Sequence, residues 1–152
     1  MRMRYAILYF VTAAILSACA VPNPPSLTDS WELSLEVTGG LAGVQRQLSI
    51  SNTGELIARD QASGAVVEVQ VPAADLVALT SLLTQLPSPD MVVPETMAPC
   101  NDCFEYTLRV SMGGLQTDLV TNDVSLENSS YAPLISKLTD LLQKALAGEF
   151  GN

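Results

Sequence analysis

Histidine is absent from the 152-residue chain. Its absence excludes the Ser-His-Asp and Cys-His catalytic systems, HExxH zinc sites and imidazole proton shuttles. Aromatic residues make up only 5% of the sequence and charged residues 15%, whereas hydrophobic residues make up 48%, which is typical of a chain that folds around a core. The sequence also has no DxDxDG calcium-binding loop. We therefore expect no enzyme activity, no catalytic residue, no metal site and no cofactor.

Basic residues are scarce as well. Seven Lys and Arg stand against sixteen Asp and Glu, and the formal charge is −9. Arg2 and Arg4 lie in a segment that we expect to be removed, which takes the charge of the remaining chain to −11. This balance would repel a nucleic acid, so no nucleic-acid partner is expected. The acidic residues are scattered along the chain, as is typical of a solvated surface.

Residues 1–18 have the pattern of an export signal. A basic start is followed by an apolar run from Tyr5 to Leu16, which is shorter than the roughly 20 residues that span a bilayer but suits a signal-peptide core. The run ends in Leu16-Ser17-Ala18-Cys19, which resembles the lipobox of bacterial lipoproteins. The resemblance implies cleavage before Cys19 and attachment of a diacylglycerol to its sulfur. The alternative is an ordinary secretory signal with a chance cysteine.

Residues 19–30 are expected to form a tether. Pro22, Pro24 and Pro25 favour an extended, semi-rigid path. Two or more acyl chains on Cys19 would anchor the protein stably to a membrane. The predicted location is therefore the bacterial cell envelope, on the extracytoplasmic side of a membrane. Since no Asp follows Cys19, the pattern resembles export to the outer membrane in a cell that has two membranes.

Residues 31–148 are predicted to form one α+β domain with an antiparallel sheet. Short turns separate the strands and favour hairpins. Arg46 interrupts the apolar face of the second strand, which predicts that this strand ends or bulges near the preceding glycines. Alternation of apolar and polar residues predicts six strands, over residues 31–37, 44–50, 55–60, 65–71, 104–112 and 115–121.

Two helices are predicted from leucines spaced three and four residues apart. One runs from Pro72 to Leu86, with the proline suited to a first helical turn. The other runs from Leu134 to Ala145 and ends before Gly148. We expect both helices to pack on the apolar face of the sheet, because each has one apolar stripe to bury.

Cys100 and Cys103 form a CxxC pair, for which three interpretations exist. Half of a zinc site is disfavoured because four ligands are needed and the chain has no histidine and no second pair. A redox dithiol usually lies at a helix N-terminus, whereas this pair precedes a predicted strand. In an exported protein a structural disulfide is favoured. It would connect the long stretch from Pro87 to Asp102 to the strand that begins at Phe104.

The stretch VTGGLAGVQR, from Val37 to Arg46, holds three glycines between two predicted strands. Glycine is useful where the backbone needs a positive φ or approaches another group closely. A plain turn and a loop shaped for a partner both fit this pattern.

Two motifs carry a family resemblance. Gly39-Gly40-Leu41-Ala42-Gly43 follows a strand, and Asp102-Cys103-Phe104-Glu105-Tyr106 opens a later strand after a proline-started leucine helix. In this order the motifs resemble the emfourin family, small protein inhibitors of thermolysin-like metallopeptidases. The resemblance covers about Trp31 to Leu146.

The resemblance implies a rigid loop that enters the cleft of a zinc peptidase. The candidate partner-binding residues are Gly39, Gly40, Leu41, Ala42 and Gly43, and the proline-rich stretch from Pro87 to Asp102 is a second candidate loop. An alternative is that the glycine motif is only the structural signature of a bulged hairpin. The alternative function is a non-enzymatic envelope binding or assembly module with a different partner.

Overall fold

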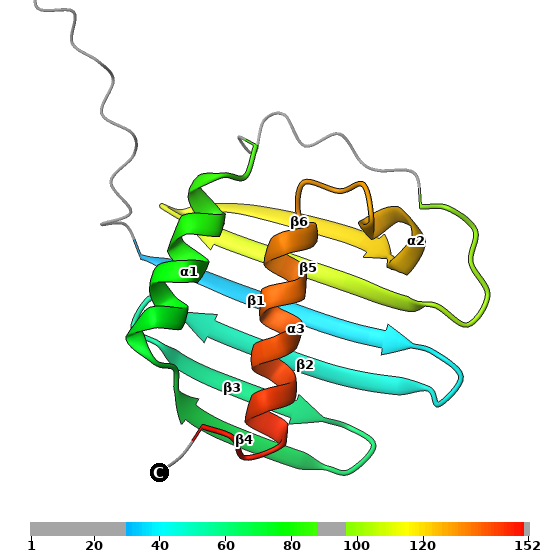
Figure 1. Ribbon diagram of the computed structural model, residues 1–152, viewed down its shortest axis with the longest axis horizontal. Coiled ribbons are helices and arrows are strands. Elements are labelled where there is room, and N and C mark those ends of the chain that lie inside the picture. The colour runs from blue at the N-terminus through cyan, green and yellow to red at the C-terminus, as the bar shows by residue number, and fades with distance from the viewer. Residues whose placement is uncertain (1–29, 88–96, 151–152) are drawn as a thin grey trace, which may run out of the picture.

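The computed structural model describes residues 30–87 and 97–150. Within these residues the chain forms one antiparallel sheet and three helices (Figure 1). The elements in chain order are β1 (Trp31–Gly39), β2 (Val44–Ser51), β3 (Glu55–Asp60), β4 (Ala65–Gln70), α1 (Ala73–Thr84), β5 (Phe104–Met112), β6 (Leu115–Asn122), α2 (Asp123–Leu126) and α3 (Ala132–Leu146).

The six strands lie in the order β4-β3-β2-β1-β5-β6, and every neighbouring pair is antiparallel. The predicted α+β class with a sheet of about six strands is confirmed. Four of the five pairings are hairpins between consecutive strands. The fifth joins β1 to β5 from Trp31↔Met112 to Gly39↔Phe104, and this pairing brings the glycine motif beside the start of β5.

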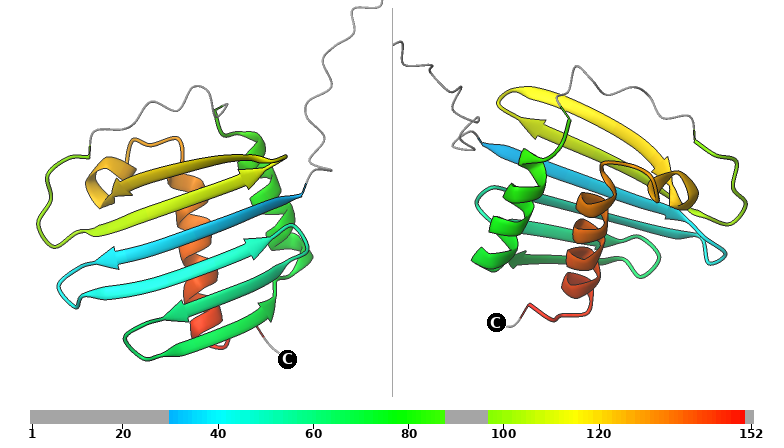
Figure 2. Two further views of the ribbon diagram at one scale, coloured as in Figure 1. Left: turned by 180° about the vertical axis from the view of Figure 1, so that it is seen from behind. Right: turned by 45° about the horizontal axis from the view of Figure 1, so that its top comes forward.

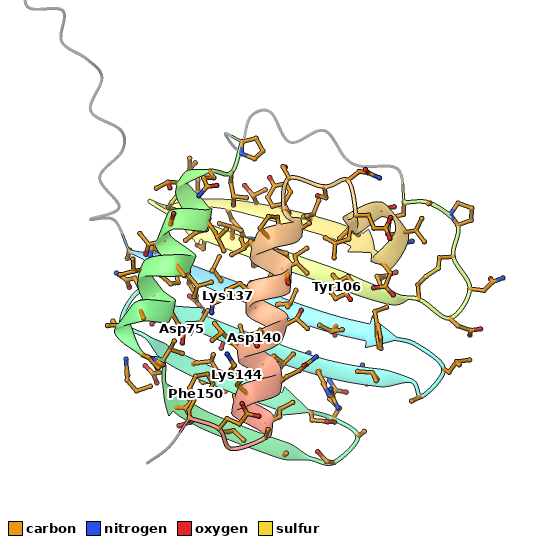
Figure 3. All side chains as sticks on the ribbon, in the orientation of Figure 1. Asp75, Tyr106, Lys137, Asp140, Lys144 and Phe150 are labelled. Atoms are coloured by element: carbon orange, nitrogen blue, oxygen red, sulfur yellow. A yellow bond between two sulfur atoms is a disulfide. The ribbon has the colours of Figure 1, made fainter. Side chains whose placement is uncertain are left out.

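Both long helices cover one face of the sheet, and the opposite face is free of helices in the view from behind (Figure 2). Alternate strand residues and the helix leucines form a single core. Lys137 of α3 bridges to Asp75 of α1 with an Nζ–Oδ1 distance of 2.6 Å (Figure 3). The largest fully buried side chains are Leu33, Leu35, Leu48, Ile50, Leu56, Leu79, Leu108, Leu134, Ile135, Leu138, Leu141 and Leu142.

The prediction that the second strand ends or bulges near Arg46 is wrong. β2 pairs continuously with β1 from Gly39↔Val44 to Glu32↔Ser51. Arg46 lies opposite Val37, on the face that carries the helices. Its Nε is 3.1 Å from Asp60 Oδ2, and 38% of its side chain remains exposed. A charged residue is tolerated here because an ion pair compensates for its partial burial.

Candidate functional site

The candidate site is the turn between β1 and β2, which we call the glycine turn and define as Gly39–Gly43. Gly39, Gly40 and Gly43 have φ angles of 98°, 68° and 59°, values that residues with a side chain rarely adopt. The Gly43 amide donates a hydrogen bond of 3.1 Å to the Gly40 carbonyl. The predicted need for positive φ at these glycines is confirmed.

The first two glycines also pack against a distant segment. The Gly40 amide donates to the Cys103 carbonyl oxygen at 3.0 Å. A Cβ atom added at Gly39 would lie 2.5 Å from that same oxygen, and one added at Gly40 would lie 2.8 Å from the Phe104 ring. A Cβ at Gly43 would meet nothing within 4 Å. Close approach to backbone therefore requires glycine at position 39. At position 40 a side chain would have to displace the Phe104 ring, and at position 43 backbone conformation alone favours glycine.

Leu41 extends into solvent from this turn. Its exposure is 90%, the highest among the large hydrophobic residues that the structure describes as exposed. Leucine is usually buried, so a leucine held in solvent on a conformationally restricted turn is a candidate contact residue. Ala42 beside it is also exposed.

The cysteine pair lies directly beside the glycine turn. Cys100 and Cys103 are joined as a disulfide with a Cα–Cα distance of 5.9 Å, and both side chains are half-buried. Within the described residues, Asp102 is the only non-glycine residue with a positive φ, at 63°. The pairing agrees with the interpretation of the CxxC motif as a structural disulfide. The segment that the disulfide closes supplies the carbonyl oxygen that accepts the Gly40 amide hydrogen bond.

We call Cys100–Cys103 the disulfide segment. Residues at the start of the short helix α2 form hydrogen bonds to both flanks of this segment. On one side, the Asn122 Nδ2 donates to the Ala98 carbonyl at 2.7 Å and the Ala98 amide donates to Ser125 Oγ at 2.9 Å. On the other side, the Phe104 amide donates to Asp123 Oδ2 at 2.9 Å. The ends of the segment are thus fixed to the β6–α2 corner.

Asp123 has a second partner in Tyr106. The Tyr106 hydroxyl donates to Asp123 Oδ1 at 2.8 Å, and Tyr106 lies beside α3 on the helix-covered face of the sheet (Figure 3). Burial, together with the hydrogen bond to this carboxylate and its negative charge, raises the pKa of Tyr106 to about 12. Tyr106 therefore stays protonated at neutral pH and donates to Asp123.

Neither α2 nor Asp123 was predicted from the sequence to be part of the site. A local signal for the helix was present in Asn122, whose side-chain oxygen accepts from the Ser125 amide at 2.9 Å. Asparagine is a strong N-cap residue, and an acidic residue in the first turn favours a helix start. The role of Asp123 toward Phe104 and Tyr106 depends on strand pairing, so it had no local signal.

A groove of about 350 Å³ is lined in part by Tyr106. Its other lining residues come from α2 and α3, and most of them have polar side chains. The lining residues are Tyr106, Leu126, Ile135, Ser136, Thr139, Asp140 and Gln143. This groove is the second surface feature at which a partner could bind.

The described residues hold no group of three or more Cys, Asp or Glu side chains arranged to bind a metal ion. In the same residues, no helix has the length and apolar character needed to cross a bilayer. The described residues do not include the predicted signal peptide, Cys19 and the rest of the predicted tether up to residue 29, or residues 88–96 of the second candidate loop.

The chain matches no protein-family model and no curated protein in sequence. A function for this protein is therefore supported by the geometry of the glycine turn and by the two sequence motifs.

Proposed function

We propose that this chain is a lipid-anchored extracytoplasmic protein that inhibits a thermolysin-like zinc metallopeptidase. The glycine turn would enter the peptidase cleft, with Leu41 as the leading side chain. The observation that carries the proposal is the 90% exposure of Leu41 on a turn whose backbone is bonded to Cys103. The anchor at Cys19 rests on the lipobox resemblance.

The restricted turn supports this function energetically. A flexible loop loses conformational entropy when it binds, and a loop already held in one shape loses less. The backbone of the glycine turn is restrained by its own Gly43–Gly40 hydrogen bond and by the Gly40–Cys103 hydrogen bond. A turn of this kind can occupy a cleft without supplying any reactive group.

Titration of a thermolysin-like peptidase with the full-length chain tests the proposal. A peptidase encoded next to this chain is the first choice. The expected result is stoichiometric loss of peptide cleavage, with binding weakened about tenfold or more by Leu41→Ser, because a buried anchor residue dominates many interfaces. Leu115→Ser is the matched control, since Leu115 is 64% exposed and lies beside Met112, at the end of the sheet away from the glycine turn.

Equal inhibition by both leucine variants would contradict the role of the glycine turn. No inhibition of a cognate peptidase by the unmodified chain would contradict the proposed function itself.

The groove beside Tyr106 favours a second candidate, a non-enzymatic envelope binding module. Ser136 lines the groove and is exposed, so a photo-crosslinking residue placed there would capture an occupant. The same residue at position 41 would capture a partner of the glycine turn. A defined adduct with a peptidase at position 41 supports inhibition, whereas a defined adduct at position 136 alone supports the binding module.

A further inference from the structure

The Cys103 carbonyl oxygen is the contact between the disulfide segment and the glycine turn. It accepts the Gly40 amide hydrogen bond at 3.0 Å, and the backbone at Gly39 passes so close to it that a Cβ would lie at 2.5 Å. Any displacement of this oxygen therefore acts directly on both glycines. The conformation of the glycine turn depends on where Cys103 is held.

The position of Cys103 depends in turn on two restraints, the hydrogen bond from the Phe104 amide to Asp123 and the disulfide. The bond to Cys100 closes a turn of four residues, and within it Asp102 has the left-handed φ of 63°. Few residues with a side chain adopt this region, and Asp is one of those that do so more often. Asp102 is exposed, and closure of the turn by the disulfide favours its conformation.

We propose that the Cys100–Cys103 disulfide is a positioning element for the glycine turn, and that its reduction weakens partner binding. This inference rests on the proposed function and names a regulation of the same site. The reductant is a dithiol. One of its thiolates attacks a sulfur of the pair to form a mixed disulfide, and its second thiolate then displaces the protein sulfur.

The exchange is balanced. Two electrons and two protons pass to Cys100 and Cys103, which become thiols, and the dithiol becomes a disulfide. Asp102 is then free to leave the left-handed region. The Cys103 carbonyl keeps the restraint of the neighbouring Phe104 amide, which donates to Asp123, but it loses the restraint of the disulfide, so its contact with Gly40 becomes less rigid. The oxidised protein is the form that binds.

Hydrogen exchange of the full-length chain, followed by mass spectrometry, tests the positioning role. Fragments that cover the glycine turn and the turn between β3 and β4 are compared before and after addition of a dithiol. The second turn is a matched control, because the Gln61 amide donates to the Gln45 carbonyl at 3.0 Å at the same end of the sheet. We expect exchange in the glycine turn to rise about tenfold or more while the control turn is unchanged.

The double variant Cys100→Ser, Cys103→Ser provides the same comparison without a reductant. Faster exchange limited to the glycine turn, in either sample, supports the inference. Unchanged exchange in the glycine turn, or an equal rise in both turns, overturns it.

Inhibition assays separate this inference from the proposed function. Weaker inhibition by the reduced chain, with faster exchange in the glycine turn, supports both. Equal inhibition by the oxidised and reduced chains overturns redox regulation of binding. Failure of the oxidised chain to inhibit any cognate peptidase overturns the proposed function, and the exchange result then still decides whether the disulfide positions the turn.

Discussion

Two neighbouring turns at one end of the sheet are held in different ways. In the β3–β4 turn, Asp60 Oδ1 accepts the amides of Ala62 at 2.9 Å and Ser63 at 3.3 Å. The glycine turn has one internal hydrogen bond and depends on Cys103, a residue far along the chain. Both turns contain glycine with a positive φ, yet one is closed by its own side chains and the other is supported by a separate segment.

This difference shows what each turn is suited for. A turn that is closed by its own residues tolerates change in the rest of the molecule, because its hydrogen bonds are local. A turn that is hydrogen-bonded to a segment distant in sequence keeps its shape only in the folded protein. Its conformation also changes when that segment moves. The second arrangement suits a binding surface whose shape is regulated.

The largest effect is expected from Gly39→Ala. Alanine at this position would have both a φ of 98° and a Cβ 2.5 Å from the Cys103 oxygen, so the free energy of unfolding should fall by about 2–4 kcal/mol. Gly64→Ala is the matched control, since its φ is 71° but its Cβ would meet nothing within 4 Å. It should lose only about 1 kcal/mol. Urea denaturation measures both, and equal losses would contradict the difference between the turns.

The next largest effect is expected at high pH, where ionisation of the Tyr106 hydroxyl should lower the free energy of unfolding. The folded-state pKa of Tyr106, about 12, lies above its ordinary value of 10.0, so the neutral hydroxyl stabilises the fold. This contribution is complete below pH 10 and is lost as the pH rises through 12. We expect a loss of about 1–2 kcal/mol over this range, because the hydrogen bond to Asp123 is only partly buried and solvent screens it. Urea denaturation measures this loss.

Tyr106→Phe should make this high-pH loss smaller, because phenylalanine has no group to ionise. The part due to Lys144, whose pKa is raised by its hydrogen bond to Asp140, should remain. Persistence of the same loss in Tyr106→Phe would show that the hydroxyl–Asp123 contact does not cause it.

A smaller effect is expected for the β3–β4 turn in acid. The Ser63 amide, together with Arg46 and the Ala62 amide, lowers the pKa of Asp60 below 3.8. Its charge therefore stabilises the fold above that value, and the contribution is lost as the pH falls through the lowered pKa. Asp60→Asn, which keeps an acceptor oxygen, should show a smaller fall in the urea midpoint over this acid range than the unmodified chain. An identical fall would show that the Asp60 charge does not contribute.

The smallest effect on stability is expected at the tip of the glycine turn. Leu41 is 90% exposed, so Leu41→Ser should change the free energy of unfolding by no more than about 0.5 kcal/mol. Its thermal midpoint should equal that of the unmodified chain even where inhibition is lost. A large fall in stability would show that Leu41 supports the turn and is not free to contact a partner.

The elements of the fold were predictable because their signals are local. Alternation identified the six strands, and leucine spacing identified α1 and α3. The β1–β5 pairing had no such signal, since any two strands with an apolar face can pair. The Arg46 prediction failed for the same reason, because its partner Asp60 belongs to a different strand.

The site was predictable only in part. The three glycines and the cysteine pair were recognisable from residue type and spacing. That Gly40 bonds to Cys103, and that Asp123 holds Phe104 and Tyr106, follows from the register of β1, β5 and β6. Register is set by the whole sheet and cannot be read from one strand.

The direction of β1 has a consequence for where the protein can act. The strand has nine residues and spans about 30 Å, with the entry of the chain at one end and the glycine turn at the other (Figure 1). With the chain held by a lipid at Cys19, as proposed, β1 would separate the glycine turn by about 30 Å from the end of the domain at which the predicted tether joins it. The protein would then meet partners that diffuse in the aqueous compartment, and its reach would be set by the sheet as well as by the length of the tether.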